Sequence, residues 1–186
     1  MAKGKKKWVI GIFIVAAIIV GSVLIFTPKE DGEIRIGSIM PLSGDAAAYG
    51  LPLQKSANLA VEEINSHGGI SGKKIKIIFE DGKCNGKDAT SAAQKLINID
   101  GIKIILGGVC SGETLGAAPI AESNKVILFS PGSGSPDITK AGDYIFRNFP
   151  SDASSGSKIA ESAIEKQYKN VAVLSELSDY AQAVSL

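Results

Sequence analysis

The chain has 186 residues, of which 45% are hydrophobic and 21% charged, and its formal net charge is +1 at pH 7. This length suffices for one domain with a real apolar core. Because Lys3, Lys5, Lys6 and Lys7 are clustered at the N-terminus, the rest of the chain carries more acidic than basic residues, which argues against nucleic acid as a partner.

The N-terminal segment predicts export. Residues 1–7 are basic, and residues 8–26, "WVIGIFIVAAIIVGSVLIF", form an uncharged apolar run that is long enough to span a bilayer. The basic flank is expected to stay in the cytoplasm, which places everything after the run outside it. The run is interpreted as an uncleaved transmembrane anchor or a cleaved signal peptide, and residues 27–33 as a short polar linker.

After the linker, segments of strand and helix character alternate to the end of the chain. The pattern of apolar residues predicts strands over residues 34–42, 73–81, 102–109, 126–132, 144–150 and 170–177. It predicts helices over residues 51–69, 88–101, 113–125 and 154–168, and the start of another from residue 179. This alternation predicts an α/β fold with a doubly wound, mostly parallel sheet.

The stretch "GGVCSGETLG", residues 107–116, allows two interpretations. A Gly-x-Cys-x-Gly turn between a strand and a helix could expose Cys110 as the nucleophile of a cysteine hydrolase. Alternatively, Cys110 is half of a disulfide with Cys84, since two cysteines in an exported protein are commonly paired. Both follow predicted strands, and the carboxyl ends of parallel strands lie at the same edge of a sheet, where ligands also bind.

Other chemistry finds little support in the sequence. A hydrolase needs a base, but His67, the one histidine, precedes Cys110, whereas the elbow fold expects it afterwards. His67 also suits a helix C-terminus. The stretch "GGISGKK" does not match a phosphate-binding loop and leads into a strand. The sequence has no cluster with metal-ligand spacing, so no cofactor or metal is expected.

Several motifs together resemble one family. The opening strand and loop "IGSIMPLSGDAAAYG", the segment "AVEEINSHGGISGKKIKIIFEDGKC", the turn "GGVCSGET" and the loop "SPGSGSPDIT" are similar to the type I periplasmic binding proteins, specifically the leucine/isoleucine/valine-binding family. The resemblance covers nearly all of the chain from Ile34 onward. It implies a two-lobed receptor, with residues 34–150 as the first lobe and residues 151–186 as the start of an incomplete second lobe. Because the chain stops at Leu186 within the predicted start of a helix, we expect it to be truncated.

The resemblance also assigns candidate ligand-binding residues. Ser111 matches the serine that binds the ligand carboxylate, and Ser133 and Ser135 lie in the loop that holds the rest of the head group. Tyr49 matches an aromatic residue that lines the cleft, and Tyr180 a tyrosine at the start of the second lobe. Each has an ordinary alternative: an N-cap for Ser111, loop serines without a ligand, and surface tyrosines.

The sequence departs from the family pattern at two of these places. Position 134 is glycine where the family often has threonine, and position 181 is alanine where glycine usually follows the tyrosine. The resemblance implies a non-catalytic protein outside the cytoplasm that captures an amino acid or amide-like solute, with ABC permease subunits as partners. The carboxylate that pairs with the ligand ammonium is expected in the second lobe. A ligand-sensing domain of an anchored receptor, or a regulator of amide metabolism, remains an alternative.

Overall fold

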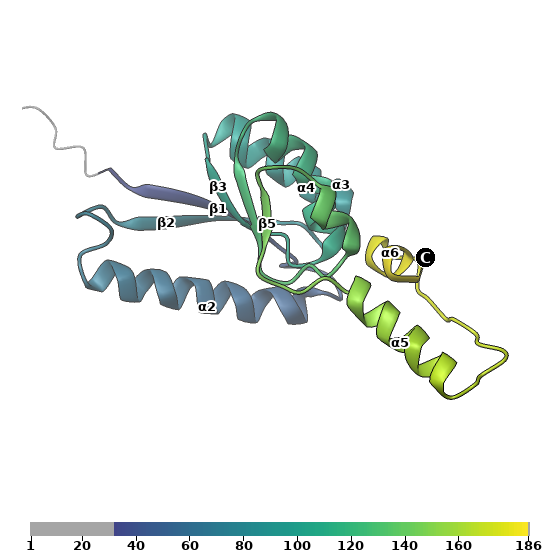
Figure 1. Ribbon diagram of the computed structural model, residues 1–186. Coiled ribbons are helices and arrows are strands. Elements are labelled where there is room, and N and C mark those ends of the chain that lie inside the picture. The colour runs from purple at the N-terminus through teal and green to yellow at the C-terminus, as the bar shows by residue number, and fades with distance from the viewer. Residues whose placement is uncertain (1–31, 186) are drawn as a thin grey trace, which may run out of the picture. The chain divides into compact units, whose positions relative to one another are not determined.

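The computed structural model describes residues 32–185 (Figure 1). The basic segment 1–7 and the predicted anchor or signal peptide, residues 8–26, lie outside the described residues. Within residues 32–185, no helix is both long and apolar enough to cross a bilayer. Residues 33–185 lie in one compact unit of the chain, which the following paragraphs describe.

A five-stranded sheet forms the centre of this unit. Its strands are β1 (Ile34–Met40), β2 (Ile75–Asp81), β3 (Ile104–Gly107), β4 (Ile127–Ser130) and β5 (Ile145–Arg147). They are arranged in the order β2-β1-β3-β4-β5, and every neighbouring pair is parallel. The predicted α/β fold with a mostly parallel sheet is therefore confirmed.

The chain reverses its direction of winding between β1 and β3. From β1 it moves outward to β2 on one side, then returns to place β3 on the other side of β1. In open parallel sheets, a crevice forms at the carboxyl ends of the two strands where the order reverses. Here those ends are Met40 and Gly107. Gly107 has φ of 138°, and an added Cβ there would overlap the backbone oxygen of Ile39, so β1 and β3 approach too closely for a side chain.

Three long helices cover the sheet. They are α2 (Ala47–Ser66), α3 (Gly86–Gln94), which continues as the π-helical turn η1 (Lys95–Ile99), and α4 (Ser111–Ser123). Figure 1 shows α2 on one side of the sheet and the pair α3 and α4 on the other. The predicted helices therefore exist, although α2 and α4 begin four and two residues before the predicted residues 51 and 113.

The core lies between the sheet and the pair α3 and α4. Small side chains on the two helices let them pack closely; these are Ala89, Ala92 and Ala93 on α3 and Ala117, Ala118 and Ala121 on α4. The closest approach is at Gly86 and Gly116, where a Cβ on Gly116 would overlap the Gly86 backbone. The Thr90 hydroxyl donates to the Gly116 carbonyl over 2.8 Å. This packing brings the N-terminal ends of α3 and α4 together.

The C-terminal part contains the 3-10 helix η2 (Pro136–Lys140), α5 (Ala153–Glu165) and α6 (Asp179–Ser185). The strand predicted over residues 170–177 is wrong, because these residues form no regular element. Leu174 is fully exposed in this segment. A strand requires a neighbour for its backbone hydrogen bonds, and none of the five described strands pairs with this segment.

Candidate ligand-binding cleft

A cleft of about 980 Å³ opens at the carboxyl edge of the sheet, next to the reversal between β1 and β3. The first turns of α2 and α4 and the disulfide contribute to its lining, as do the loop before α5 and the start of α6, where the Asp179 carboxylate lies against Gly112 in the first turn of α4. Its lining includes Tyr49, Cys84, Cys110, Ser111, Gly134, Asp152 and Tyr180. The charged residues among its lining residues are Asp152, Glu176 and Asp179, all acidic.

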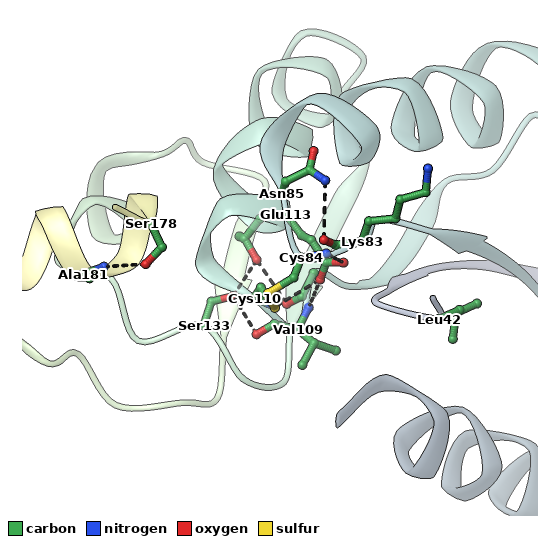
Figure 2. Close-up of a disulfide and its surroundings, with 12 residues drawn as sticks. Leu42, Lys83, Cys84, Asn85, Val109, Cys110, Glu113, Ser133, Ser178 and Ala181 are labelled. Carbon is green, nitrogen blue, oxygen red and sulfur yellow. Dashed lines mark hydrogen bonds between the residues drawn. A yellow bond between two sulfur atoms is a disulfide. The ribbon is translucent and has the colours of Figure 1, made fainter. Parts of the chain in front are cut away.

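The disulfide predicted between Cys84 and Cys110 is present, with the two Cα atoms 5.2 Å apart (Figure 2). It joins the loop after β2 to the residue that precedes α4. Neither cysteine has a free thiol, so the arrangement does not provide the nucleophile of the cysteine hydrolase. His67 is also badly placed for that role. It follows the last turn of α2, at the edge of the sheet where β2 begins, and its Nδ1 lies 2.9 Å from the Glu63 carbonyl oxygen.

Ser111 is the first residue of α4 and lines the cleft. The residue is 4% exposed, and its Oγ accepts a hydrogen bond from the backbone N–H of Ser135 over 3.2 Å. An acceptor role leaves the hydroxyl hydrogen available to a ligand oxygen. Because the N-terminal end of a helix carries unpaired N–H groups and a partial positive charge, this position favours an anion.

Ser133 and Ser135 lie beneath the cleft surface instead of lining it. Both are fully buried. The Ser133 hydroxyl lies 2.7 Å from the Thr114 hydroxyl and donates to the Gly108 carbonyl over 3.1 Å, while the Ser135 hydroxyl accepts from the Asp137 N–H at the start of η2. In these contacts, both side chains shape the loop between β4 and η2. Any contact between these two serines and a ligand therefore stays a prediction.

Both predicted tyrosines line the cleft. The side chain of Tyr49, in the first turn of α2, is 71% exposed. The Tyr180 hydroxyl donates to the Asp152 carboxylate over 2.9 Å, and this hydrogen bond raises the pKa of Tyr180 above its usual value, with burial adding to the effect. The structure thus brings Tyr49, Ser111 and Tyr180 to one cleft.

Asp152 is a cleft residue that the sequence analysis did not name. Its backbone N–H donates to the Gly134 carbonyl over 2.9 Å, and its carboxylate occupies the space in which a side chain at position 134 would lie. A larger residue at position 134 would require this carboxylate to move. No local motif identified Asp152, because its place depends on the folding of two loops that are distant in sequence.

Glu113 is the second residue that the sequence analysis missed. Although charged, it is fully buried in the first turn of α4. Its Oε1 accepts from the Cys84 N–H over 3.0 Å, and its Oε2 accepts from the N–H groups of Val109 and Cys110 over 2.9 and 3.1 Å (Figure 2). A glutamate three residues after a helix cap is the sequence signature of this arrangement, and "CSGE" would have indicated it.

Burial raises the pKa of Glu113 above its usual value; the hydrogen bonds from Cys110, Cys84 and Val109 oppose the shift, and the nearby charge of Asp81 adds to it. Asp81, at the end of β2, shows the opposite balance. Burial raises its pKa, but hydrogen bonds from the Ser43 hydroxyl and from the N–H groups of Leu42 and Lys83 outweigh burial and hold the pKa below its usual value. Two carboxylates thus connect the loops at this edge.

Comparison with known proteins accords with this arrangement of fold and cleft. A family model described as periplasmic binding protein matches residues 33–186. The chain belongs to this family. Among curated proteins, this periplasmic binding protein is 33% identical over 165 residues to the Leu/Ile/Val-binding protein BraC3 of Rhizobium johnstonii, covering 87% of this chain and 44% of that protein. It is 34% identical over 155 residues to a leucine-, isoleucine-, valine-, threonine- and alanine-binding protein of Pseudomonas aeruginosa, covering 82% of this chain and 41% of that protein.

Solved structures show the same relationship. The branched-chain amino acid transporter substrate-binding protein LivJ from Streptococcus pneumoniae, in complex with isoleucine, is 35% identical with a TM-score of 0.71, covering 82% of this chain and 44% of that one. A solute-binding protein of an ABC transporter from Rhodopseudomonas palustris, in complex with 3,4-dihydroxybenzoic acid, is 32% identical with a TM-score of 0.67, covering 83% of this chain and 41% of that one. This periplasmic binding protein thus spans less than half the length of these relatives.

Proposed function

We propose that the protein is an extracytoplasmic solute-binding protein whose cleft binds an amino acid or a closely related small carboxylate. The observation that carries this proposal is the position of Ser111, at the start of α4 and in the lining of the cleft beside the strand-order reversal. A hydroxyl that can donate and the N-terminal end of a 13-residue helix favour the same negatively charged group.

The acidic side chains in the lining of the cleft suit a positive charge. Asp152 lines the cleft, and its carboxylate already accepts a hydrogen bond from Tyr180. An α-amino acid carries a carboxylate and an ammonium group on one carbon, so it would meet an anion-favouring helix end and acidic side chains at once. Under this proposal, Asp152 supplies within the described chain part of the negative charge that the sequence analysis placed in the second lobe.

The printed names of the relatives support a carboxylate ligand without deciding what else it carries. LivJ from Streptococcus pneumoniae was solved with isoleucine, and the Rhodopseudomonas palustris protein with an aromatic acid that has no ammonium group. Both of these ligands carry a carboxylate. The acidic lining of this cleft favours the amino acid over the aromatic acid, because the ammonium group brings a positive charge to the acidic side chains, whereas the aromatic acid brings only its negative charge.

We further propose that the bound solute is delivered to ABC permease subunits, because the similar Rhodopseudomonas palustris protein is a solute-binding protein of an ABC transporter. In this proposal, residues 34–150 form the first lobe, residues 151–186 begin the second, and the apolar run 8–26 directs the chain out of the cytoplasm or anchors it to the membrane. The proposal describes a binding protein with no catalytic step.

The function is tested by titrating the 186-residue chain with L-leucine, L-isoleucine and L-valine, followed by heteronuclear NMR. Leucinamide, which lacks the carboxylate, and 3,4-dihydroxybenzoate, which lacks the ammonium group, are the matched controls. We expect shifts at the amides of Ser111 and Gly112 with a dissociation constant on the order of millimolar, about −4 kcal/mol, because this chain spans less than half the length of its relatives. Equal shifts with leucinamide would contradict the carboxylate site, and tighter binding of the aromatic acid would contradict the amino acid preference.

A further inference from the structure

The feature that leads beyond the proposed function is the buried carboxylate of Glu113. It contacts both of the loops that the disulfide joins. One oxygen accepts from the N–H of Cys84, and the other from the N–H groups of Val109 and Cys110 (Figure 2). The carboxylate therefore bridges the loop after β2 and the loop after β3 alongside the covalent bond between Cys84 and Cys110.

The surrounding backbone leaves room for this side chain. A Cβ on Gly82 would overlap Oε1 of Glu113, and a Cβ on Gly108 would overlap the Cβ of Glu113. Glycine thus occupies a position in each loop where a side chain would displace the glutamate. Three backbone donors satisfy a carboxylate that is fully buried, and a buried charge without such partners would be costly.

The three residues whose N–H groups bind the Glu113 carboxylate all line the cleft. Cys84, Val109 and Cys110 line the cleft, and Ser111 follows directly in the chain. Cys84 has φ of 60°, a backbone conformation that an L-residue adopts only when its surroundings hold it there. The disulfide and the Glu113 carboxylate both act on this residue.

We propose that Glu113 is a positioning residue of the cleft, whose carboxylate holds the Cys84 loop against the start of α4 independently of the disulfide. When the disulfide is reduced, the two loops stay together through Glu113, and the first turn of α4 keeps its place. The consequence for ligand binding rests on the proposed function, whereas the consequence for the loops and for the disulfide does not.

The reduction equilibrium of the disulfide gives the first test. Two molecules of glutathione reduce the bond to two protein thiols and are themselves oxidised to one glutathione disulfide. If Glu113 keeps the two thiols close together, it favours re-formation of the bond. The measured quantity is the squared concentration of glutathione divided by the concentration of glutathione disulfide at which half of the protein is reduced. In Glu113→Gln, we expect this quantity to be at least tenfold lower than in the wild type.

The matched control is Glu122→Gln in the same helix. The Glu122 carboxylate also accepts a hydrogen bond from a backbone N–H, that of Tyr144 over 2.9 Å, but it does not contact either cysteine loop. The Glu122→Gln substitution makes the same chemical change in α4, and we expect the reduction equilibrium of this variant to stay within threefold of the wild type. An equal shift in both variants, or no shift in Glu113→Gln, would overturn the proposal.

Amide hydrogen exchange gives a second test, which needs no ligand. One part of it is measured on the wild type and does not depend on any variant. In the reduced wild-type chain, we expect the amides of Cys84, Val109 and Cys110 to stay protected to within tenfold of the oxidised chain. Reduction of the wild type and the Glu113→Gln substitution in the oxidised protein each lower the protection factors of these amides by some factor. In the reduced Glu113→Gln protein, the protection factors should fall at least tenfold further than the product of these two factors. Loss of protection on reduction of the wild type would refute the proposal even if Glu113→Gln does not fold.

Wild type and Glu113→Gln, each in the oxidised and the reduced form, are then titrated with L-leucine. This titration separates the proposed function from the proposed role of Glu113. Coupled loss of amide protection without any L-leucine binding would leave Glu113 as a positioning residue and refute the proposed function. L-leucine binding that responds to reduction and to Glu113→Gln independently, with the two effects simply multiplying, would retain the function and refute the role of Glu113.

Discussion

The backbone N–H of Ser135 donates a hydrogen bond to the side-chain oxygen of Ser111 over 3.2 Å. This contact connects the loop after β4 to the first residue of α4. It also commits one face of the Ser111 oxygen to the protein and orients the hydroxyl. Ser135 therefore affects the cleft through Ser111, although its own hydroxyl caps η2.

Ser111→Ala should weaken ligand binding while the fold persists. Losing a hydrogen bond to a charged group costs about 1.5–3 kcal/mol, which corresponds to roughly a tenfold to hundredfold loss of affinity. NMR titration with L-leucine is the measurement. Ser123→Ala removes a hydroxyl from the exposed C-terminal end of the same helix and should leave the affinity unchanged. If both variants bind equally well, Ser111 serves only to hold the Ser135 loop.

The disulfide should be complete in protein that has been exported. Mass spectrometry after alkylation of the unfolded chain without reductant should find neither cysteine modified, because Cys84 and Cys110 are bonded to each other. After reduction, both should be labelled. Two alkylated cysteines in the unreduced sample would contradict the disulfide and restore a free thiol at Cys110.

Gly116→Ala should destabilise the protein, because the added Cβ would overlap the Gly86 backbone where α3 and α4 are closest. Forcing one carbon into a packed contact typically costs about 1–3 kcal/mol of the free energy of unfolding, which urea denaturation can measure. Gly156→Ala in α5 is the contrasting change, since a Cβ added there would lie 3.9 Å from the Val184 carbonyl oxygen, an ordinary van der Waals contact. That substitution should be neutral or should stabilise by up to about 1 kcal/mol.

The pH dependence of stability should differ in sign between two carboxylates. The pKa of Asp81 is lower in the folded protein, so its contribution to stability is present above the unfolded pKa of about 3.9 and is lost as the pH falls through the folded pKa. The pKa of Glu113 is raised, so its contribution is present below the unfolded pKa of about 4.3 and is lost as the pH rises through the folded pKa.

Urea denaturation between pH 3 and pH 7 measures both effects. Asp81→Asn should reduce the acid-side loss of stability, and Glu113→Gln should flatten the change above the usual glutamate pKa. If the two variants shifted the pH profile in the same direction, the opposite balances of burial and hydrogen bonding at these carboxylates would be incorrect.

Leu174→Glu should change the stability little and improve solubility. Leu174 is fully exposed in the irregular segment between α5 and α6, and surface substitutions usually alter the free energy of unfolding by less than about 0.5 kcal/mol. A charge there should lower the light scattering of concentrated protein. Leu128→Glu, which places the charge in the core at a fully buried strand residue, should prevent folding. Loss of the fold in Leu174→Glu as well would show that Leu174 is packed.

The sequence predicted the parallel sheet and the disulfide because local periodicity and strand ends carry that information. Apolar segments such as residues 102–109 can be predicted as strands from their local pattern alone. Because Cys84 and Cys110 each follow a predicted strand, and parallel strands end at the same edge of a sheet, the two cysteines are then expected to lie close together. Residues 170–177 have the same apolar character, yet they form no strand, since a strand also depends on a neighbour that local sequence does not show.

The candidate site was only partly predictable for the same reason. The resemblance to the family assigned Ser111, and its place at the expected start of a helix supported that assignment. The inward direction of the Ser133 and Ser135 hydroxyls depends on Thr114, Gly108 and Asp137, and these contacts arise from the packing of separate loops. Asp152 reaches the cleft through contacts with Gly134 and Tyr180, 18 residues before it and 28 after it in the sequence, which no short motif records.

The fit of the Asp152 carboxylate against Gly134 has a consequence for protein engineering. Placing threonine at position 134 should move the Asp152 carboxylate, because the new side chain and the carboxylate would occupy the same volume. A substitution at position 134 is therefore expected to change the part of the cleft that the Asp152 carboxylate lines as well. A library designed to alter this cleft should therefore vary the two codons jointly.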